Sequence, residues 1–185
     1  FGELIGAWLT ERWQEMGEPS TIFLIELGPG RGTMMVDALH GIRSQSKFRN
    51  AISIHLLEIS PLLRDIQKIN FAGMSLPTEK IYWHTDPETL PDGPLLVIAN
   101  EFFDALPIHQ FERTKAGWCE RLIEQDNGRF QFTLGGALSE NERSIPKAIR
   151  ENAPLNSIFE IRPAATAITS QISTQIARFG GAALI

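Results

Sequence analysis

The chain alternates between short, mainly apolar runs and longer segments in which apolar residues recur every three or four positions. The short runs predict buried strands of a parallel sheet, because strands covered on both faces are largely apolar. They occupy 22–25, 51–58, 81–84 and 95–99, and a last run at 180–185 predicts a fifth strand. Helical spacing recurs over 1–9, 33–42, 62–70 and 163–179. This alternation predicts an α/β fold with a doubly wound, mostly parallel sheet.

Between the fourth and fifth predicted strands the pattern changes to shorter segments. Three of them predict strands, at 108–113, 118–124 and 129–134. The turn Asp126-Asn127-Gly128 between the last two is a strong hairpin signal. We therefore expect one Rossmann-like domain over 1–185, truncated at both ends, with a β-meander inserted over 108–134. The meander could grip a polypeptide, or it could be an edge extension that only stabilises the sheet.

Composition narrows the class of protein. Hydrophobic residues make up 43% of the 185 residues, yet no apolar run approaches the ~20 residues that a membrane-spanning helix needs. The single cysteine, Cys119, excludes an internal disulfide and a cysteine-based metal cluster. The 4 histidines show no metal-ligand spacing, so we expect no metal. A net charge of -5 argues against nucleic acid as the main partner.

The turn after the first predicted strand carries the most specific chemistry. Glu26 is followed by glycines at every second position, Gly28, Gly30 and Gly32, and a helix pattern begins at Thr33. Without Cβ atoms this backbone can turn sharply and lie directly against a ligand. A dinucleotide fingerprint needs a glycine where Thr33 stands, and a phosphate-binding loop needs a lysine that this segment lacks. The pattern Glu-x-Gly-x-Gly-x-Gly instead resembles the first motif of class I S-adenosylmethionine (SAM) methyltransferases, and Glu26 suits the cationic end of SAM.

Carboxylates also follow the second and third predicted strands. Glu58 ends the second strand, where a carboxylate can accept hydrogen bonds from both ribose hydroxyls of an adenosine. Ser60 and Pro61 then predict the N-cap and first turn of the next helix. Asp86 lies at the mouth of the third strand, beside the loop where the adenine ring usually sits in this topology. NAD-binding folds use the same ribose carboxylate, so Glu58 supports an adenosine ligand without separating the two cofactors.

The fourth predicted strand ends in Asn100-Glu101-Phe102-Phe103-Asp104. Two carboxylates and an amide at the carboxyl end of a central strand lie on the ligand-binding edge of an open sheet. The two phenylalanines could exclude water and face a sulfonium, whose positive charge favours the face of an aromatic ring. We therefore expect the methyl acceptor to bind beside Asn100, Glu101 and Asp104.

Together these motifs resemble the MidA-like family, which includes a mitochondrial arginine methyltransferase of complex I assembly. The resemblance covers 1–185 and is carried by FGELIGAWL, ELGPGRGT, LLEISPLLR, IANEFFDALPIHQF and GWCERL. It implies a SAM-dependent protein methyltransferase that modifies an arginine of a respiratory complex I subunit. It also implies a cytoplasmic location in a bacterium and a matrix location in a mitochondrion. The glycine turn and Glu58 match the cofactor site of the family, and 100–104 matches its acceptor-side motif.

An arginine acceptor sets a specific chemical requirement. Its guanidinium stays protonated in water, so a methyltransferase must orient it and receive a proton. Glu101 and Asp104 could hold the guanidinium in bidentate fashion and direct one nitrogen towards the methyl group. We expect these two carboxylates to carry the catalytic role, with Asn100 beside them.

Two other functions stay open. An NAD(P)-linked oxidoreductase shares the strand, the turn and the ribose carboxylate, but this chain lacks the third glycine and an obvious hydride-site histidine or Tyr-x-x-x-Lys motif. A noncatalytic assembly factor could keep the fold and bind a partner through its inserted strands. The intact glycine turn and Glu58 weigh against a decayed site.

Overall fold

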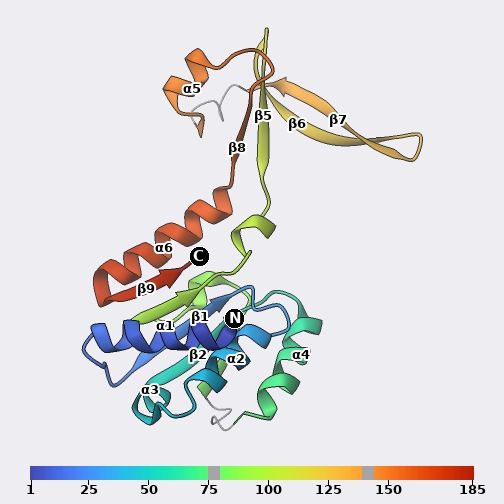
Figure 1. The fold of residues 1–185 in the computed structure, drawn as a ribbon. Coiled ribbons are helices and arrows are strands. Elements are labelled where there is room, and N and C mark those ends of the chain that lie inside the picture. Colours follow the sequence, from blue (N-terminus) through green and yellow to red (C-terminus); the bar gives the residue numbers. More distant parts are fainter. Residues whose placement is uncertain (75–79, 139–143) are drawn as a thin grey trace. The chain divides into compact units, whose positions relative to one another are not determined.

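The computed structural model describes residues 1–74, 80–138 and 144–185 (Figure 1). The chain divides into two compact units. The first comprises Phe1–Ala105 together with Ala167–Ile185, and the second comprises Leu106–Thr166. The sequence predicts a single domain with an insertion over 108–134. The inserted unit is larger than that range because elements beyond 134 fold with the inserted strands.

A five-stranded parallel sheet with the order β3-β2-β1-β4-β9 forms the centre of the first unit. Its strands are β1 (Ile22–Leu27), β2 (Ile52–Leu57), β3 (Ile81–His84), β4 (Leu95–Ile98) and β9 (Gly181–Leu184). This order confirms the predicted doubly wound α/β fold, in which the direction of winding reverses beside β1. The carboxyl ends of β1, β2 and β4 therefore adjoin one another at one edge of the sheet.

Helices pack against this sheet and bury its apolar strands. They are α1 (Gly2–Glu15), α2 (Thr33–Gly41), α3 (Ser46–Ala51), α4 (Pro61–Ala72) and α6 (Pro163–Phe179). One core joins α1, α2 and α4 to the sheet and includes Leu24 and Leu96. Leu95 and Val97 alternate with Leu96 along β4 and are also fully buried, so the sheet is covered on both faces there. Among the described residues, no helix combines the length and the apolar character of a membrane span.

The helix starts show how local sequence sets these elements. Ser60 caps α4, as predicted, because its Oγ accepts a hydrogen bond from the backbone N–H of Leu63, and Pro61 is the first helical residue. The short helix α3 was not predicted. It places Phe48 in the core, where the ring stacks on Trp13 with the ring centroids 5.1 Å apart.

The second unit is an antiparallel sheet with the order β7-β6-β5-β8. Its strands are β5 (His109–Thr114), β6 (Gly117–Asp126), β7 (Arg129–Ala137) and β8 (Ile158–Ile161), and its helix is α5 (Lys147–Asn152). The three predicted strands are confirmed, and β8 joins them by pairing with β5. Phe111, Trp118 and Ile145 form a small core of their own. The alternative of an edge extension is wrong, because this sheet is separate from the parallel sheet.

Candidate functional site

The glycine turn connects β1 to α2. Gly28 has φ +63 and Gly32 has φ +77, in the left-handed region that residues with a Cβ rarely occupy. A Cβ on Gly28 would lie 2.8 Å from the ring of Phe102, and a Cβ on Gly32 would lie 3.1 Å from the ring of Phe71. Gly30 also has a positive φ of +55, but no atom lies within 4 Å of the place where its Cβ would be. The turn is therefore tightly packed at its two ends and open at its middle.

A buried glutamine of α4 holds the turn in this conformation. Gln67 is fully buried, its Nε2 donates to the carbonyl oxygen of Gly30 over 2.6 Å, and its Oε1 accepts from Nε1 of Trp83 over 2.9 Å. The side chain of Asn70 donates to the next carbonyl, that of Arg31, over 2.8 Å. Two successive carbonyls of the turn are thus bound by side chains of one helix. This arrangement pre-organises the turn before any ligand arrives.

Gln67→Leu is expected to lower the free energy of unfolding by about 1–3 kcal/mol, because it leaves the indole N–H of Trp83 and the carbonyl of Gly30 without their partner. Denaturant unfolding of the two proteins measures the difference. Gln175→Leu is a matched control, since it removes an exposed hydrogen bond to Asp92 and is expected to change the free energy by less than ~0.5 kcal/mol. Equal effects of the two substitutions would contradict the role of Gln67.

The carboxyl group of Glu26 is buried at the end of β1. Its side chain is 2% exposed, and its Oε2 has no hydrogen-bond partner among the described residues. Burial raises the pKa of Glu26 from 4.5 to about 7, because the charged form loses its hydration. A buried oxygen without a donor is unfavourable, and a ligand that brings a donor or a positive charge would relieve it. Glu26 is therefore suited to bind such a ligand beside the glycine turn.

Glu26→Gln is expected to stabilise the ligand-free protein at alkaline pH but not at acidic pH. The pKa of Glu26 is about 7 in the folded state against 4.5 in the unfolded state, so its proton stabilises the fold fully below 4.5 and this contribution is lost as the pH rises through 7. Above about pH 8 the variant should gain about 1–3 kcal/mol in the free energy of unfolding.

Denaturant unfolding over a series of pH values measures this gain. Glu88→Gln changes an exposed carboxyl and is the control, with an expected change of less than ~0.5 kcal/mol at each pH. A gain for Glu26→Gln that does not vary with pH would exclude the proton on Glu26 as its cause.

Glu58 lies one residue beyond β2 and is also buried, at 7% exposed. Its backbone N–H donates to the carbonyl of His84 over 2.9 Å, and its Oε1 accepts from the backbone N–H of Ser60 over 2.9 Å. These bonds hold the carboxylate at the edge of the sheet. Asp86 is exposed, and its Oδ1 accepts from the backbone N–H of Glu88, which caps the short 3-10 turn Pro87–Thr89. Ligand contacts by Glu58 and Asp86 stay predictions.

A chain of hydrogen bonds runs from the end of β3 back along β2 towards its amino end. The hydroxyl of Thr89 donates to the carbonyl of Asp86, so it can only accept from Nδ1 of His84, 2.8 Å away. Nε2 of His84 then accepts from Nδ1 of His55 over 2.9 Å, and Nε2 of His55 accepts from the hydroxyl of Ser53 over 3.2 Å. This assignment uses each hydrogen once and requires both imidazoles to be neutral.

Acidification is expected to destabilise the protein through this chain. Burial, and next the neighbouring His84, lower the pKa of His55 from 6.5 to about 4. The folded state thus binds fewer protons than the unfolded state between these values. The contribution of neutral His55 to the free energy of unfolding is fully present above pH 6.5. It is lost as the pH falls towards 4, which lowers the free energy of unfolding by about 1–3 kcal/mol.

Denaturant unfolding between these pH values measures the fall, and His55→Gln should remove most of it. His40→Gln, at the exposed end of α2, is the control and should leave the fall unchanged. An equal fall in the two variants would assign the acid sensitivity to other groups.

The segment after β4 lies against the glycine turn. The ring of Phe102 packs on Gly28 and forms an edge-to-face pair with Phe103, with the ring centroids 5.3 Å apart. Glu101 has φ +55, a strained conformation for a residue with a Cβ. Such strain persists only where the surrounding structure imposes it, and it is common at functional sites. Glu101 and Asp104 are both exposed.

A hollow of about 230 Å³ opens beside Asn100. Its other lining residues are mainly apolar and come from the ends of β4 and β9 and from α1 and α2; they are Phe1, Ile5, Met34, Ile98, Ala99, Leu184 and Ile185. Among the described residues that line this hollow, Asn100 is thus the one with a polar side chain, and it follows the carboxyl end of β4.

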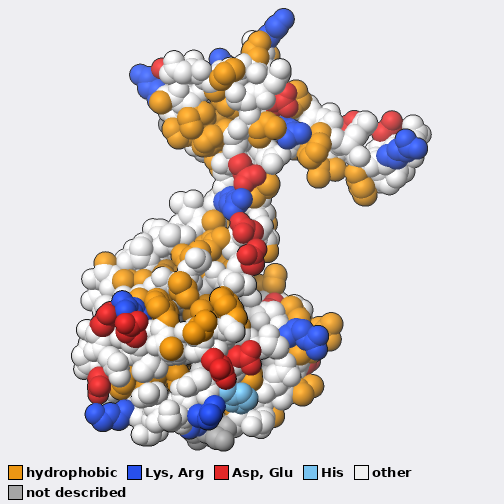
Figure 2. Space-filling view, viewed as in Figure 1, with side chains coloured by type: hydrophobic (Ala, Val, Ile, Leu, Met, Phe, Trp, Pro, Cys, Tyr) orange, Lys and Arg blue, Asp and Glu red, His pale blue; other side chains and the backbone are white. Residues whose placement is uncertain are grey.

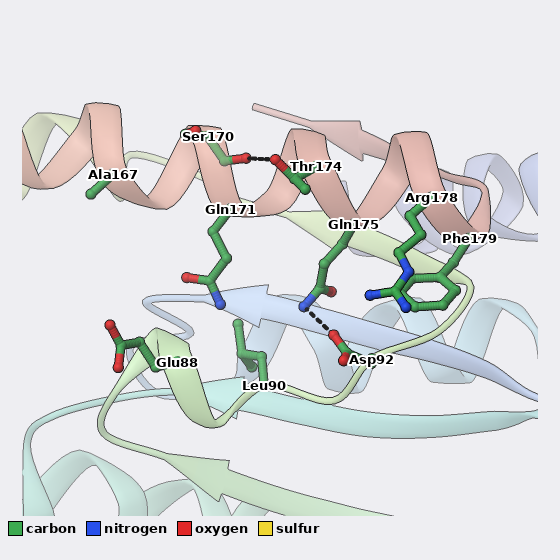
Figure 3. Close-up of a pocket in the computed structure, with 10 residues that line it drawn as sticks. All are labelled: Glu88, Leu90, Asp92, Ala167, Ser170, Gln171, Thr174, Gln175, Arg178 and Phe179. Carbon is green, nitrogen blue, oxygen red and sulfur yellow. Dashed lines mark hydrogen bonds between the residues drawn. The ribbon is translucent and has the colours of Figure 1, made fainter.

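A larger hollow of about 690 Å³ lies along α6 (Figure 3). Figure 3 shows the side chains of Gln171 and Gln175 extending from α6 towards the segment that carries Leu90 and Asp92. Nε2 of Gln175 donates to Asp92 over 3.2 Å. None of the residues predicted for the site lines this hollow.

The structure brings most of the predicted site residues to one place. Glu26, Glu58 and Asn100 lie at or just beyond the ends of β1, β2 and β4, which are neighbours in the sheet. Asp86 lies one strand further away, after β3. The sequence analysis missed Gln67. Its signal was available, because Gln67 and Asn70 share one face of the helix that follows the second predicted strand.

Comparisons with known proteins show which proteins this chain resembles. A family model described as an S-adenosyl-L-methionine-dependent methyltransferase matches residues 4–185. The mitochondrial protein arginine methyltransferase NDUFAF7 of Xenopus tropicalis is 36% identical over 100% of this chain, and the human protein of that name is 32% identical. The chain spans about half the length of these relatives, 47% and 46% respectively.

A solved structure supports the fold. A protein from Burkholderia thailandensis, crystallised with S-adenosyl-homocysteine, matches with a TM-score of 0.72 and 20% sequence identity. The match covers 95% of this chain and 43% of that protein. Because the family model covers nearly the whole chain, we conclude that the chain belongs to the S-adenosyl-L-methionine-dependent methyltransferase family.

Proposed function

We propose that this chain is the cofactor-binding part of a SAM-dependent protein methyltransferase, and that it binds SAM at the glycine turn. The observation that carries the proposal is the buried carboxyl of Glu26, whose Oε2 has no partner among the described residues beside an open glycine turn. SAM brings an ammonium and a sulfonium, and either would satisfy that oxygen. A nicotinamide dinucleotide brings phosphates, which a buried carboxyl would repel.

The residues present fit SAM at each part of the molecule. Glu26 would hold its cationic end, and the open backbone at Gly30 leaves room for close approach. Glu58, held in place by Ser60, would accept the ribose hydroxyls. Asp86 follows the adjacent strand, where the adenine ring is expected. Bound SAM would supply an electrophilic methyl group.

We propose a protein arginine as the methyl acceptor, because the relatives at 36% and 32% identity are named protein arginine methyltransferases. Glu101 and Asp104 are exposed carboxylates on the segment that contacts the turn through Phe102. They would hold the guanidinium, present one nitrogen and receive the proton that is released. Asn100 would orient the backbone of the substrate, and Phe102 would exclude water.

The finer assignments extend the family resemblance described in the sequence analysis. We propose a respiratory complex I subunit as the substrate protein. The relatives are named mitochondrial, so we propose the mitochondrial matrix as the compartment in a eukaryote and the cytoplasm in a bacterium. Modification there would aid assembly of the complex.

Two measurements test the proposal. Calorimetry with SAM and with NADH decides the cofactor: we expect SAM to bind and NADH not to bind. Mass spectrometry of the candidate substrate, incubated with the full-length protein and SAM, should show methylated arginine. Binding of NADH alone would replace the proposal with an oxidoreductase, and binding of SAM without methylation of any protein would support a noncatalytic assembly factor.

A further inference from the structure

The hairpin of the second unit extends beyond the sheet that supports it. β5 pairs with β6 only as far as Arg121, whereas β6 and β7 stay paired out to Asp126 and Arg129. We call residues 122–134 the arm. Within the part of the chain that the structure describes, no third strand pairs with the arm over most of its length, and such a two-stranded ribbon is at best marginally stable in water.

One face of the arm is apolar and exposed. Residues directly opposite each other in an antiparallel pair point to the same face. The pairs Ile123 with Phe132, Gln125 with Phe130 and Arg121 with Leu134 therefore share one face. Four large apolar side chains on it are exposed: Ile123 (68%), Phe130 (77%), Phe132 (64%) and Leu134 (46%). Figure 2 shows apolar side chains gathered along this hairpin.

The charges of the arm restrict what can cover this face. Glu124 and Asp126 alternate with the apolar residues and point to the opposite face, where Glu124 accepts a hydrogen bond from Gln131. The one charged side chain on the apolar face is Arg121, which lies 4.2 Å from the centre of the Phe132 ring and bonds to Gln110. The carboxylate beside this face, Glu112, already pairs with Arg121 over 3.6 Å. A basic, arginine-bearing segment would therefore meet no unpaired carboxylate on the apolar face of the arm, and an acidic partner would meet only an engaged guanidinium.

We propose that the apolar face of the arm binds the same face of a second copy of this chain about a two-fold axis. An apolar surface whose single charge, that of Arg121, is already paired with Glu112 is complementary to itself and needs no partner of opposite charge, as a two-fold contact requires. If the exposed surface of these four side chains were buried in both copies, the contact would cover on the order of 1,000 Å², which is the minimum area of a biological interface. A ribbon of marginal stability needs a binding partner whenever the protein is folded, and a second copy of the chain meets that need.

Sedimentation velocity of the full-length protein tests the proposal. We expect a dimer, and we expect Ile123→Arg to raise its dissociation constant by roughly 30-fold or more, because a charge would be buried without a partner. Leu122→Arg is the matched control. Leu122 neighbours Ile123 on β6, is 44% exposed and points to the opposite face, so its substitution should leave the dimer intact.

Cross-linking provides a second readout. It detects contact between the two arms directly and does not rely on a change in the dissociation constant. The one native cysteine, Cys119, is buried. A cysteine introduced by Phe132→Cys should therefore form a disulfide-linked dimer under oxidation, and one introduced by Leu122→Cys should not. A monomeric wild type, or a dimer that Ile123→Arg leaves intact, would overturn the proposal. A monomer in which the arm becomes protected only on adding a substrate protein would assign the face to the substrate.

Discussion

Gly30→Ala is expected to weaken SAM binding by more than about 100-fold while the fold survives. No protein atom lies within 4 Å of the added methyl group, so the substitution meets no steric conflict within the chain. The positive φ of +55 makes it unfavourable by about 1 kcal/mol. The methyl group would occupy the open middle of the turn, where we propose that SAM lies. Calorimetry with SAM measures the affinity, and thermal unfolding measures the fold.

Gly17→Ala is the matched control for this prediction. Gly17 also has a positive φ, of +83, and no atom within 4 Å of the place of a Cβ, but it follows α1 and lies outside the turn. The two variants should lose similar stability, and only Gly30→Ala should lose SAM. If Gly30→Ala binds SAM as tightly as Gly17→Ala does, the turn is not the cofactor site.

The second large effect is expected from the double variant Glu101→Gln and Asp104→Asn. Methyl transfer to the protein substrate should fall by more than about 100-fold, because neutral amides can neither hold a guanidinium by charge nor receive its proton. SAM affinity should change by less than about 3-fold, because the proposed SAM contacts lie at Glu26 and Glu58. Single-turnover methylation and calorimetry separate the two quantities.

Its matched control removes two carboxylates elsewhere. Glu124→Gln with Asp126→Asn makes the same change in charge on the polar face of the arm and should leave both quantities unchanged. Full methylation by the Glu101 and Asp104 double variant would assign the proton transfer to other groups. If the double variant lost both SAM binding and methylation, these carboxylates would belong to the cofactor site instead.

Much of the first unit could be predicted because its signals act over a few residues. The run at 22–25 predicted β1, and Ser60 and Pro61 predicted the start of α4, where the cap bond to Leu63 forms. The glycine spacing predicted a turn that needs left-handed backbone, and Gly28 and Gly32 have it. In each case the residue sets its own conformation or that of its near neighbours.

Two elements escaped prediction because they depend on distant partners. β8 has only four residues and forms a strand by pairing with the free edge of β5. The helix α3 is only six residues long, too short to be stable by itself, and packs Phe48 against Trp13 from α1. Neither partner is near in the sequence, so the local pattern does not contain the signal.

The sequence alone determined the order of the parallel strands and the longer helices of the first unit, the need for glycine in the turn, and which carboxylates follow the strands. Only the tertiary structure decided the state of those groups. Burial at the end of β1 removes water from Glu26 and raises its pKa, and Gln67 reaches the carbonyl of Gly30 from a helix far along the chain. Hydration and long-range hydrogen bonds depend on which segments meet in space, and the order of residues does not specify that directly.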